Sequence, residues 1–246
     1  MTSQWKIAAL AAVLGAAVSV ATVLGVAVMG YFPPPSDSQF RAYLMAHPFI
    51  IFEMQSKAIA VNAENEDRAL QGAVDKVGLK TFFDPKLAFV TGPANAKTTV
   101  VEFFDYNCSH CRHTLPAVKK FYQAHKGDTR FAFIELPIFG QQSNDAARAA
   151  LAARRQQGKY VAFHFAMMSQ QNTIGPGETV DAAKEAGLDL NRLMADLKDP
   201  AIDKQMASAH ALATRIGVSG TPLFIVNGKA HPGEVTEKEL QQLSKS

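Results

Sequence analysis

The two cysteines of this 246-residue chain, Cys108 and Cys111, are separated by only two residues. The apolar stretch 98–104 before this C-x-x-C motif predicts a strand, and residues 111–125 after it predict a helix. The start of a helix carries partial positive charge, which stabilises a thiolate placed there. We therefore expect Cys108 to be exposed and acidic and to be the attacking sulfur. Cys111, one turn along and more buried, is expected to be the resolving thiol.

His110 lies between the two cysteines. An imidazole that is charged, or that donates a hydrogen bond, favours the thiolate form of a neighbouring cysteine. A stabilised thiolate makes the corresponding disulfide a stronger oxidant. His110 therefore favours a protein that donates disulfides.

Other uses of the motif are weaker. A zinc site needs about four ligands, whereas Cys108, His110, Cys111 and His113 are crowded together and no second C-x-x-C exists. Covalent haem attachment requires C-x-x-C-H, and position 112 is Arg. We predict no metal site and no cofactor. A structural disulfide, and a non-catalytic module that binds copper or zinc or acts as a chaperone, remain alternatives.

A second motif follows about 110 residues later. Thr221-Pro222 precedes the apolar stretch 223–226 and an Asn-Gly turn, which predict a strand and a hairpin. A cis proline facing a dithiol would let the preceding backbone pair with an extended peptide, as an added strand does. Alone, Thr221-Pro222 is compatible with an ordinary turn. Together with a C-x-x-C motif it is typical of the thioredoxin fold.

The chain resembles the DsbA family of thiol–disulfide oxidoreductases. Residues 103–111 are similar to that family's active-site segment and residues 217–228 to its cis-proline segment. The stretch between them, at about 141–216, resembles the helical insertion of DsbA proteins, and its glycine and proline breaks predict about four helices. The resemblance implies an α/β thioredoxin fold with a helical insertion in a domain at 79–246. It also implies that Cys108 exchanges disulfides with client proteins.

The resemblance assigns a further role to Glu102, as a buried proton acceptor beneath the dithiol. If the side chain of Glu102 faces inward, desolvation raises its pKa and suits it to this role. A solvent-facing position at the sheet edge is the open alternative. The Thr at position 221, directly before the proline, is similar to the residue found there in thiol isomerases and in the ScsC-like branch. A hydroxyl of this residue bonded to a sulfur is expected to moderate the oxidising power. The choice between an oxidase and an isomerase or reductase therefore stays open.

Residues 7–32 form an apolar stretch without a charge. A bilayer core needs about 20 residues in a helix, whereas the apolar region of a secretory signal has about 7 to 15. Lys6 precedes the stretch, which predicts a cytoplasmic start and an exported remainder. We predict a signal-anchor at 1–32 in the inner membrane and a periplasmic domain, where dithiols of this kind are used. A cleaved signal and a soluble periplasmic protein are the alternative.

The segment 33–78 is predicted to be helical. Residues 36–39 have a capping-box pattern, and the apolar residues that follow Pro48 predict a second helix to about Val61. The segment resembles the N-terminal helices of ScsC-type proteins, which can oligomerise. Apolar surface of this extent needs a partner, so residues 36–75 predict a homo-oligomer. Packing on the chain's own catalytic domain is the alternative.

Composition excludes some functions. The net charge of +3 is too small to indicate nucleic-acid binding, and no glycine-rich phosphate loop is present. His164, Met167 and Met168 have helical core spacing within the insertion, which favours packing over a metal site. The expected partners are exported cysteine-containing client proteins and a membrane redox partner, oxidising or reducing.

Overall fold

The computed structural model describes Ser19 and residues 36–245. Among these residues, no helix is both long and apolar enough to cross a membrane. The predicted anchor at 7–32 lies outside the described residues apart from Ser19.

The chain divides into two compact units, residues 1–60 and 61–246, and the division falls within helix α3 (Ile50–Val77). The first unit contains helix α2 (Asp37–Ala46) and the first turns of α3. The predicted capping box is present, because Ser36 and Gln39 each accept a hydrogen bond from the other's backbone N–H. Helix α3 has 28 residues and continues beyond Val61, through the charged stretch 62–68, to Val77.

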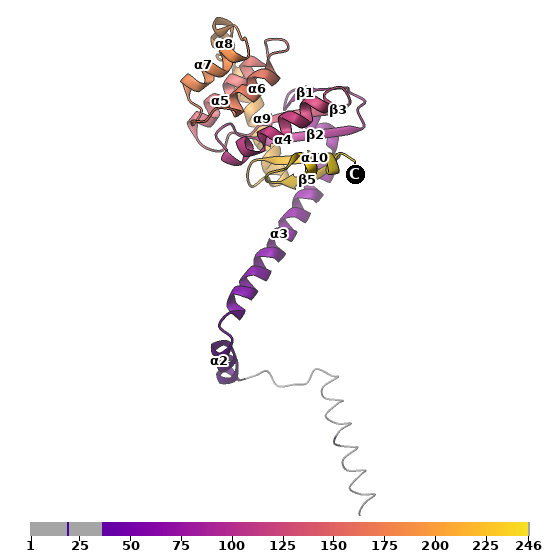
Figure 1. Cartoon of the computed structure of the whole chain (residues 1–246), viewed down its shortest axis with the longest axis vertical. Coiled ribbons are helices and arrows are strands. Elements are labelled where there is room, and N and C mark those ends of the chain that lie inside the picture. Colours follow the sequence, from indigo (N-terminus) through magenta and orange to yellow (C-terminus); the bar gives the residue numbers. More distant parts are fainter. Residues whose placement is uncertain (1–18, 20–35, 246) are drawn as a thin grey trace, which may run out of the picture. The chain divides into compact units, whose positions relative to one another are not determined.

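The second unit is built on a five-stranded sheet in the order β1-β3-β2-β4-β5 (Figure 1). Strands β2 and β3 pair in parallel, and the other neighbouring strands pair antiparallel. Branched and aromatic side chains dominate the two central parallel strands and favour the extended conformation. This arrangement confirms the predicted thioredoxin plan. The strands are β1 (Phe89–Thr91), β2 (Thr98–Phe104), β3 (Thr129–Glu135), β4 (Leu223–Val226) and β5 (Lys229–Pro232).

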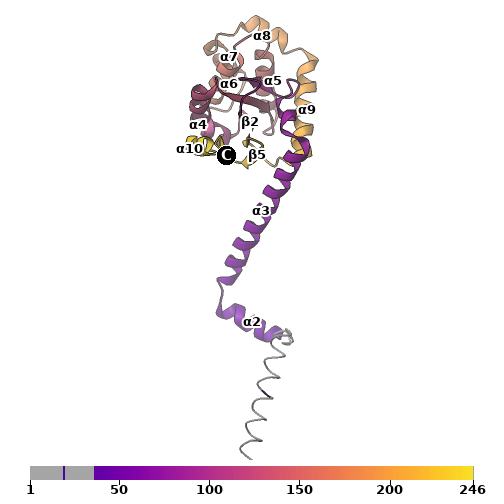
Figure 2. The same cartoon turned by 90° about the vertical axis from the view of Figure 1, so that its right-hand side faces the viewer.

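Both faces of the sheet are covered by helices. Because alternate residues of a strand point to opposite faces, each central strand contributes to two separate clusters. Val100 and Phe104 of β2 face a cluster that includes residues of helix α4 (Ser109–His125) and of the insertion. Val101 and Phe103 face a second cluster, with helix α9 (Pro200–Ile216), the last turns of α3 and the 3₁₀ helix η1 (Leu79–Phe83). Figure 2 shows α9 beside the last turns of α3.

The insertion between β3 and β4 contains five helices rather than the four predicted, among the residues described. The additional break falls at residues 187–189, where the Asp189 side chain accepts a hydrogen bond from the backbone N–H of Arg192 and starts a new helix. The last helix of the chain, α10 (Glu237–Leu243), packs against α4. Figure 1 shows the first four insertion helices grouped beside the sheet: α5 (Gln141–Ala153), α6 (Tyr160–Met168), α7 (Pro176–Glu185) and α8 (Leu190–Asp196).

Candidate active site

The loop between β2 and α4 leads to the dithiol and is fixed by the buried carboxylate of Asp105. One Asp105 oxygen accepts a hydrogen bond from the backbone N–H of Asn107 at 2.7 Å. The other accepts from the backbone N–H groups of Ile138 and Phe139, at 2.7 and 3.1 Å. The ends of the parallel strands β2 and β3 are thereby tied together directly beside the C-x-x-C motif.

Cys108 is the N-cap residue of α4, which begins at Ser109, two residues earlier than predicted. The pKa of Cys108 is lowered from 9.0 to about 5, and the neighbouring Cys111 thiol is the largest cause of this shift. Burial opposes the shift, whereas the Thr221 side chain and the backbone N–H groups of Cys111 and His110 add to it. The helix start therefore carries an acidic thiol.

The prediction that Cys108 is exposed is wrong. Its relative surface exposure is 1%, equal to that of Cys111. The cause is the segment at Thr221-Pro222, whose Thr221 carbonyl oxygen lies 3.1 Å from the Cys108 sulfur. Cys111 is buried as predicted, and desolvation raises the pKa of its thiol far above its usual value.

The Thr221-Pro222 peptide bond is cis. Gly217 is the C-cap of helix α9, and its left-handed conformation (φ +77°) suits a residue without a Cβ and ends the helix four residues before this peptide. The hydroxyl of Thr221 is buried and has no hydrogen-bond partner of normal geometry among the described residues. The Thr221 side chain is one of the smaller causes that lower the pKa of Cys108. The expectation that a Thr221 hydroxyl bonded to the sulfur moderates the oxidising power stays a prediction, since no such bond occurs among the described residues.

Glu102 faces inward, so the solvent-exposed alternative is wrong. Its strand β2 lies between β3 and β4 rather than at the sheet edge, and the side chain shares the face of Val100 and Phe104. Desolvation by burial raises the pKa of Glu102 to about 8. One carboxylate oxygen has no hydrogen-bond partner among the described residues. The charge of Glu102 also helps to raise the pKa of Cys111, after the larger effects of desolvation and of the bond to Cys108.

His110 lies on the protein surface at the mouth of the site. Its Nδ1 atom is 2.6 Å from a carboxylate oxygen of Glu234, and Nδ1 of His113 is 3.5 Å from the same oxygen. The hydrogen bond to Glu234 is the main cause that raises the pKa of His110. Sequence reasoning missed Glu234, because 124 residues separate it from His110 and no local motif marks it.

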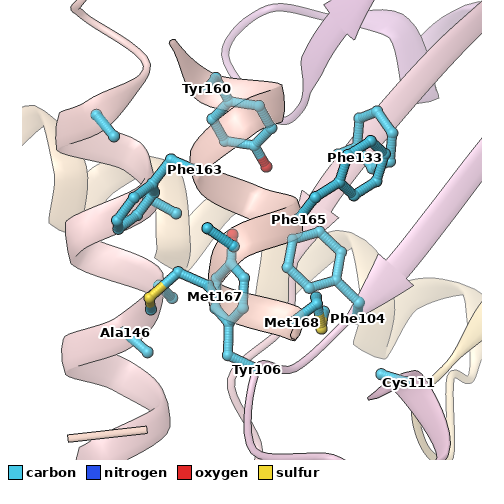
Figure 3. Close-up of a cluster of buried hydrophobic side chains, with 14 of the residues drawn as sticks. Phe104, Tyr106, Cys111, Phe133, Ala146, Tyr160, Phe163, Phe165, Met167 and Met168 are labelled. Atoms are coloured by element: carbon cyan, nitrogen blue, oxygen red, sulfur yellow. The ribbon is translucent and has the colours of Figure 1, made fainter. Parts of the chain in front are cut away.

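Aromatic residues of the insertion pack behind the dithiol, and Figure 3 shows Cys111 at the edge of this cluster. The Tyr160 hydroxyl donates a 2.5 Å hydrogen bond to Glu135, whose pKa is raised to about 7 by burial. The Tyr106 hydroxyl lies 3.2 Å from Nδ1 of His164. Burial lowers the pKa of His164 to about 3, so this histidine is neutral and belongs to the core.

Two hollows flank the dithiol. One, of about 260 Å³, is lined by His110, Thr221, Pro222 and Glu234, among other residues. The other, of about 470 Å³, is lined by residues of the first turns of α4 and by 168–171. In the part of the chain that the structure describes, no three His, Cys, Asp or Glu side chains are grouped so as to hold a metal ion.

An acidic thiol at a helix start, a second thiol one turn along and a facing cis-proline loop define the class of thiol–disulfide oxidoreductases on a thioredoxin sheet. Residues 99–244 match the family model of the DSBA-like thioredoxin domain, so the chain belongs to this family. The resemblance inferred from the two sequence motifs is thereby confirmed.

Solved structures agree with this assignment. The thioredoxin-like oxidoreductase from Silicibacter pomeroyi is 41% identical, with a TM-score of 0.61 over 67% of this chain and 93% of that chain. The thiol-disulfide exchange protein alpha-DsbA2 from Wolbachia pipientis is 26% identical, with a TM-score of 0.66 over 73% and 96%. The catalytic domain of Proteus mirabilis ScsC has the same fold at 23% identity, with a TM-score of 0.62 over 71% and 96%. The chain is a protein thiol–disulfide oxidoreductase.

The curated relatives include longer proteins. A Na(+)/H(+) antiporter, NhaA 3 of Salinispora tropica, is 32% identical over 172 residues, which are 68% of this chain and 26% of the relative. The chain thus spans about a quarter of the length of these antiporters.

Proposed function

We propose that the chain is an exported oxidoreductase that forms disulfides in client proteins through the pair Cys108 and Cys111. The observation that carries this proposal is the asymmetry of the pair, since the pKa of Cys108 is about 5 while that of Cys111 is far above its usual value. A thiolate stabilised in the reduced protein destabilises the disulfide by comparison. The reduced pair is therefore favoured, and disulfides flow from the protein to its clients.

The exchange proceeds in two displacements. A client thiolate attacks the Cys108 sulfur, the Cys108–Cys111 bond breaks, and the sulfur of Cys111 leaves with the electron pair. A second client thiolate then attacks the client sulfur of the mixed disulfide, which forms the client disulfide and releases Cys108 as a thiolate. Two electrons pass to the pair in each cycle. A membrane redox partner that accepts them completes the cycle.

Glu102 is proposed to supply the proton in this exchange. The Cys111 thiolate is the less stable leaving group, because its pKa is raised by burial. Glu102 has a pKa of about 8 and is therefore mostly protonated at neutral pH. It gives its proton to Cys111 when the disulfide opens and takes it back when the pair is oxidised again.

The hollow beside the cis-proline loop is the proposed site of the client peptide. It is lined by His110, Thr221 and Pro222 and lies on the side from which the Thr221 segment covers the sulfur. An extended client peptide that pairs with the backbone of Thr221 would place its cysteine against Cys108. Because Cys108 is buried, client binding must displace covering atoms before the sulfurs meet.

Isomerase or reductase activity of the ScsC type is the second candidate, and the N-terminal helices favour it. Self-association through residues 36–75 would present several dithiols around one client. Analytical ultracentrifugation of the chain, beside a variant with charged residues in this region, tests self-association. If both proteins are monomers, self-association through this region is excluded. Large apolar side chains are exposed throughout this region, at Phe40, Tyr43, Met45, Phe49, Ile51, Phe52, Met54, Ile59 and Val61.

The protein is proposed to be anchored in the inner membrane by its apolar residues 7–32, with the dithiol on the periplasmic side. The likeness to part of a Na(+)/H(+) antiporter is compatible with action at a membrane surface. Membrane fractionation of the expressed chain tests the proposal. A fully soluble product that lacks the first 30 or so residues would support the cleaved-signal alternative.

A reduction potential measured against glutathione tests the direction of exchange. A potential near or above that of disulfide isomerases, about −180 mV, supports the oxidase, and one near that of thioredoxin, about −270 mV, supports a reductase.

Cys108→Ala should abolish insulin reduction, and Cys111→Ala should trap covalent client adducts. Adducts trapped by Cys108→Ala instead would reverse the assignment. Stoichiometric copper or zinc binding without exchange would favour the metal carrier.

A further inference from the structure

The loop between β5 and α10 brings a carboxylate to the dithiol. The backbone N–H of Gly233 donates a 2.9 Å hydrogen bond to the carbonyl of Pro222, which ties this loop to the cis-proline loop. Thr236 caps the next helix and holds the other side of the loop. Between these two fixed points, Glu234 reaches across to His110 at 2.6 Å. Glu234 is thus held by the same loops that surround Cys108.

Among the described residues, the pKa of His110 responds to the charges of Glu234 and Cys108. The imidazole faces Glu234, and the same carboxylate lies 3.5 Å from His113 on the next turn of α4. Arg112 points elsewhere, since its guanidinium donates to the carbonyl of Asn172 at 2.7 Å. The charge of Cys108 also acts on His110, after the larger effect of Glu234. Because electrostatic coupling is reciprocal, a charged His110 also stabilises the Cys108 thiolate.

We propose that Glu234 is a positioning residue that keeps His110 charged and oriented beside Cys108, and thereby strengthens the protein as an oxidant. The inference rests on the proposed function and assigns Glu234 the setting of its redox equilibrium. An imidazole has an ordinary pKa of about 6.5, so without a partner it is mostly neutral at pH 7. The carboxylate raises the pKa of His110 and so retains the imidazolium at the pH where exchange takes place.

Glu234→Gln tests the proposal, because it removes the charge and keeps the shape. Glu237→Gln is the matched control, since Glu237 pairs with Lys120 of the same helix α4 at 2.8 Å. The pKa of His110 is measured by NMR, the pKa of Cys108 by the ultraviolet absorbance of its thiolate, and the redox equilibrium against glutathione. Only Glu234→Gln should lower the pKa of His110 and raise the pKa of Cys108.

The equilibrium constant with glutathione should shift about twofold to fivefold toward the protein disulfide, a modest change because the ion pair is partly exposed to solvent. Glu234→Asp, which keeps the charge, should recover part of it. In a His110→Ala background, Glu234→Gln should change neither the Cys108 pKa nor the equilibrium.

Three results would overturn the proposal: equal behaviour of Glu234→Gln and Glu237→Gln, an unchanged pKa of His110, or a full effect in the His110→Ala background. Failure of the proposed function is distinguishable from these. It would appear in the unsubstituted protein as an absence of exchange with glutathione and insulin, whereas the NMR titration of His110 reports on the pair in either case.

Discussion

The acidity of Cys108 predicts that the reduced protein loses stability when the pH is lowered from 7 to 4. The pKa of Cys108 is about 5 in the folded protein, against an ordinary value of 9.0. The folded state therefore binds fewer protons than the unfolded state between these values, and stability increases with pH across the interval. The contribution is complete above pH 9 and is lost as the pH falls through 5.

The magnitude follows from the two pKa values. Four units of separation correspond to about 5 kcal/mol when the whole interval has been crossed. At pH 7 only the two units above the folded value count, so the contribution is about 3 kcal/mol. At pH 4 the thiol is protonated in both states, and almost nothing remains. Solvent near the sulfur screens these interactions, so about 3 kcal/mol is an upper limit at pH 7.

The assay is urea unfolding of the reduced protein at pH 7 and pH 4, beside Cys108→Ser. Other groups titrate in the same range, Glu102 and Glu135 among them, but they are common to both proteins. The difference in unfolding free energy between the two should fall by up to about 3 kcal/mol over this interval. A difference that does not change with pH, together with a thiolate titration near 9, would refute the account of how the helix start and the Cys111 thiol stabilise this sulfur.

Three further substitutions test the buried groups around the site. Glu102→Gln should raise stability at pH 7 by up to about 3 kcal/mol, because a carboxyl whose folded pKa of about 8 exceeds its ordinary 4.5 destabilises the fold as pH rises between these values. The same substitution should slow the opening of the disulfide in stopped-flow measurements, and an unchanged rate would exclude the proton-transfer role. Tyr160→Phe should cost about 1–3 kcal/mol in urea unfolding by leaving Glu135 without its hydrogen bond, and a neutral effect would show that water replaces the hydroxyl. Asp105→Ala should cost about 3 kcal/mol, since three backbone N–H groups lose their acceptor, and faster amide hydrogen exchange at 138–139 should accompany it; unchanged exchange would mean that the loop is held otherwise.

The local elements around the dithiol could be predicted because their signals are short in sequence. The branched and aromatic residues of β2 and the amphipathic residues of α4 lie on either side of Cys108, and each pattern specifies its own element. The cis peptide at Thr221-Pro222 was predictable only through the resemblance, because a single Thr-Pro pair has no distinctive pattern. The peptide bond is cis in the structure, in agreement with that resemblance.

What the sequence could not supply were contacts between distant segments. The burial of Cys108 depends on Thr221, which lies 113 residues away, and the pairing of His110 depends on Glu234. Neither contact is encoded in a local period or motif. The additional insertion helix, α8, was missed for a different reason. The break at 187–189 that precedes it consists of one glycine and an Asp cap, a weaker signal than the Gly-Pro-Gly break near 176.

The two cysteines show which physical effect sets their chemistry. Their exposures are equal, at 1%, yet the pKa of Cys108 falls and that of Cys111 rises. Desolvation raises the pKa of both thiols, and for Cys111 it is the largest effect. For Cys108, the N-cap residue, the Cys111 thiol and the backbone N–H groups of the first turn outweigh desolvation. Cys111 lies within that turn, where the interaction with Cys108 raises its pKa further. A displacement of three residues along one helix is sufficient to separate the thiolate that attacks from the thiol that must be given a proton.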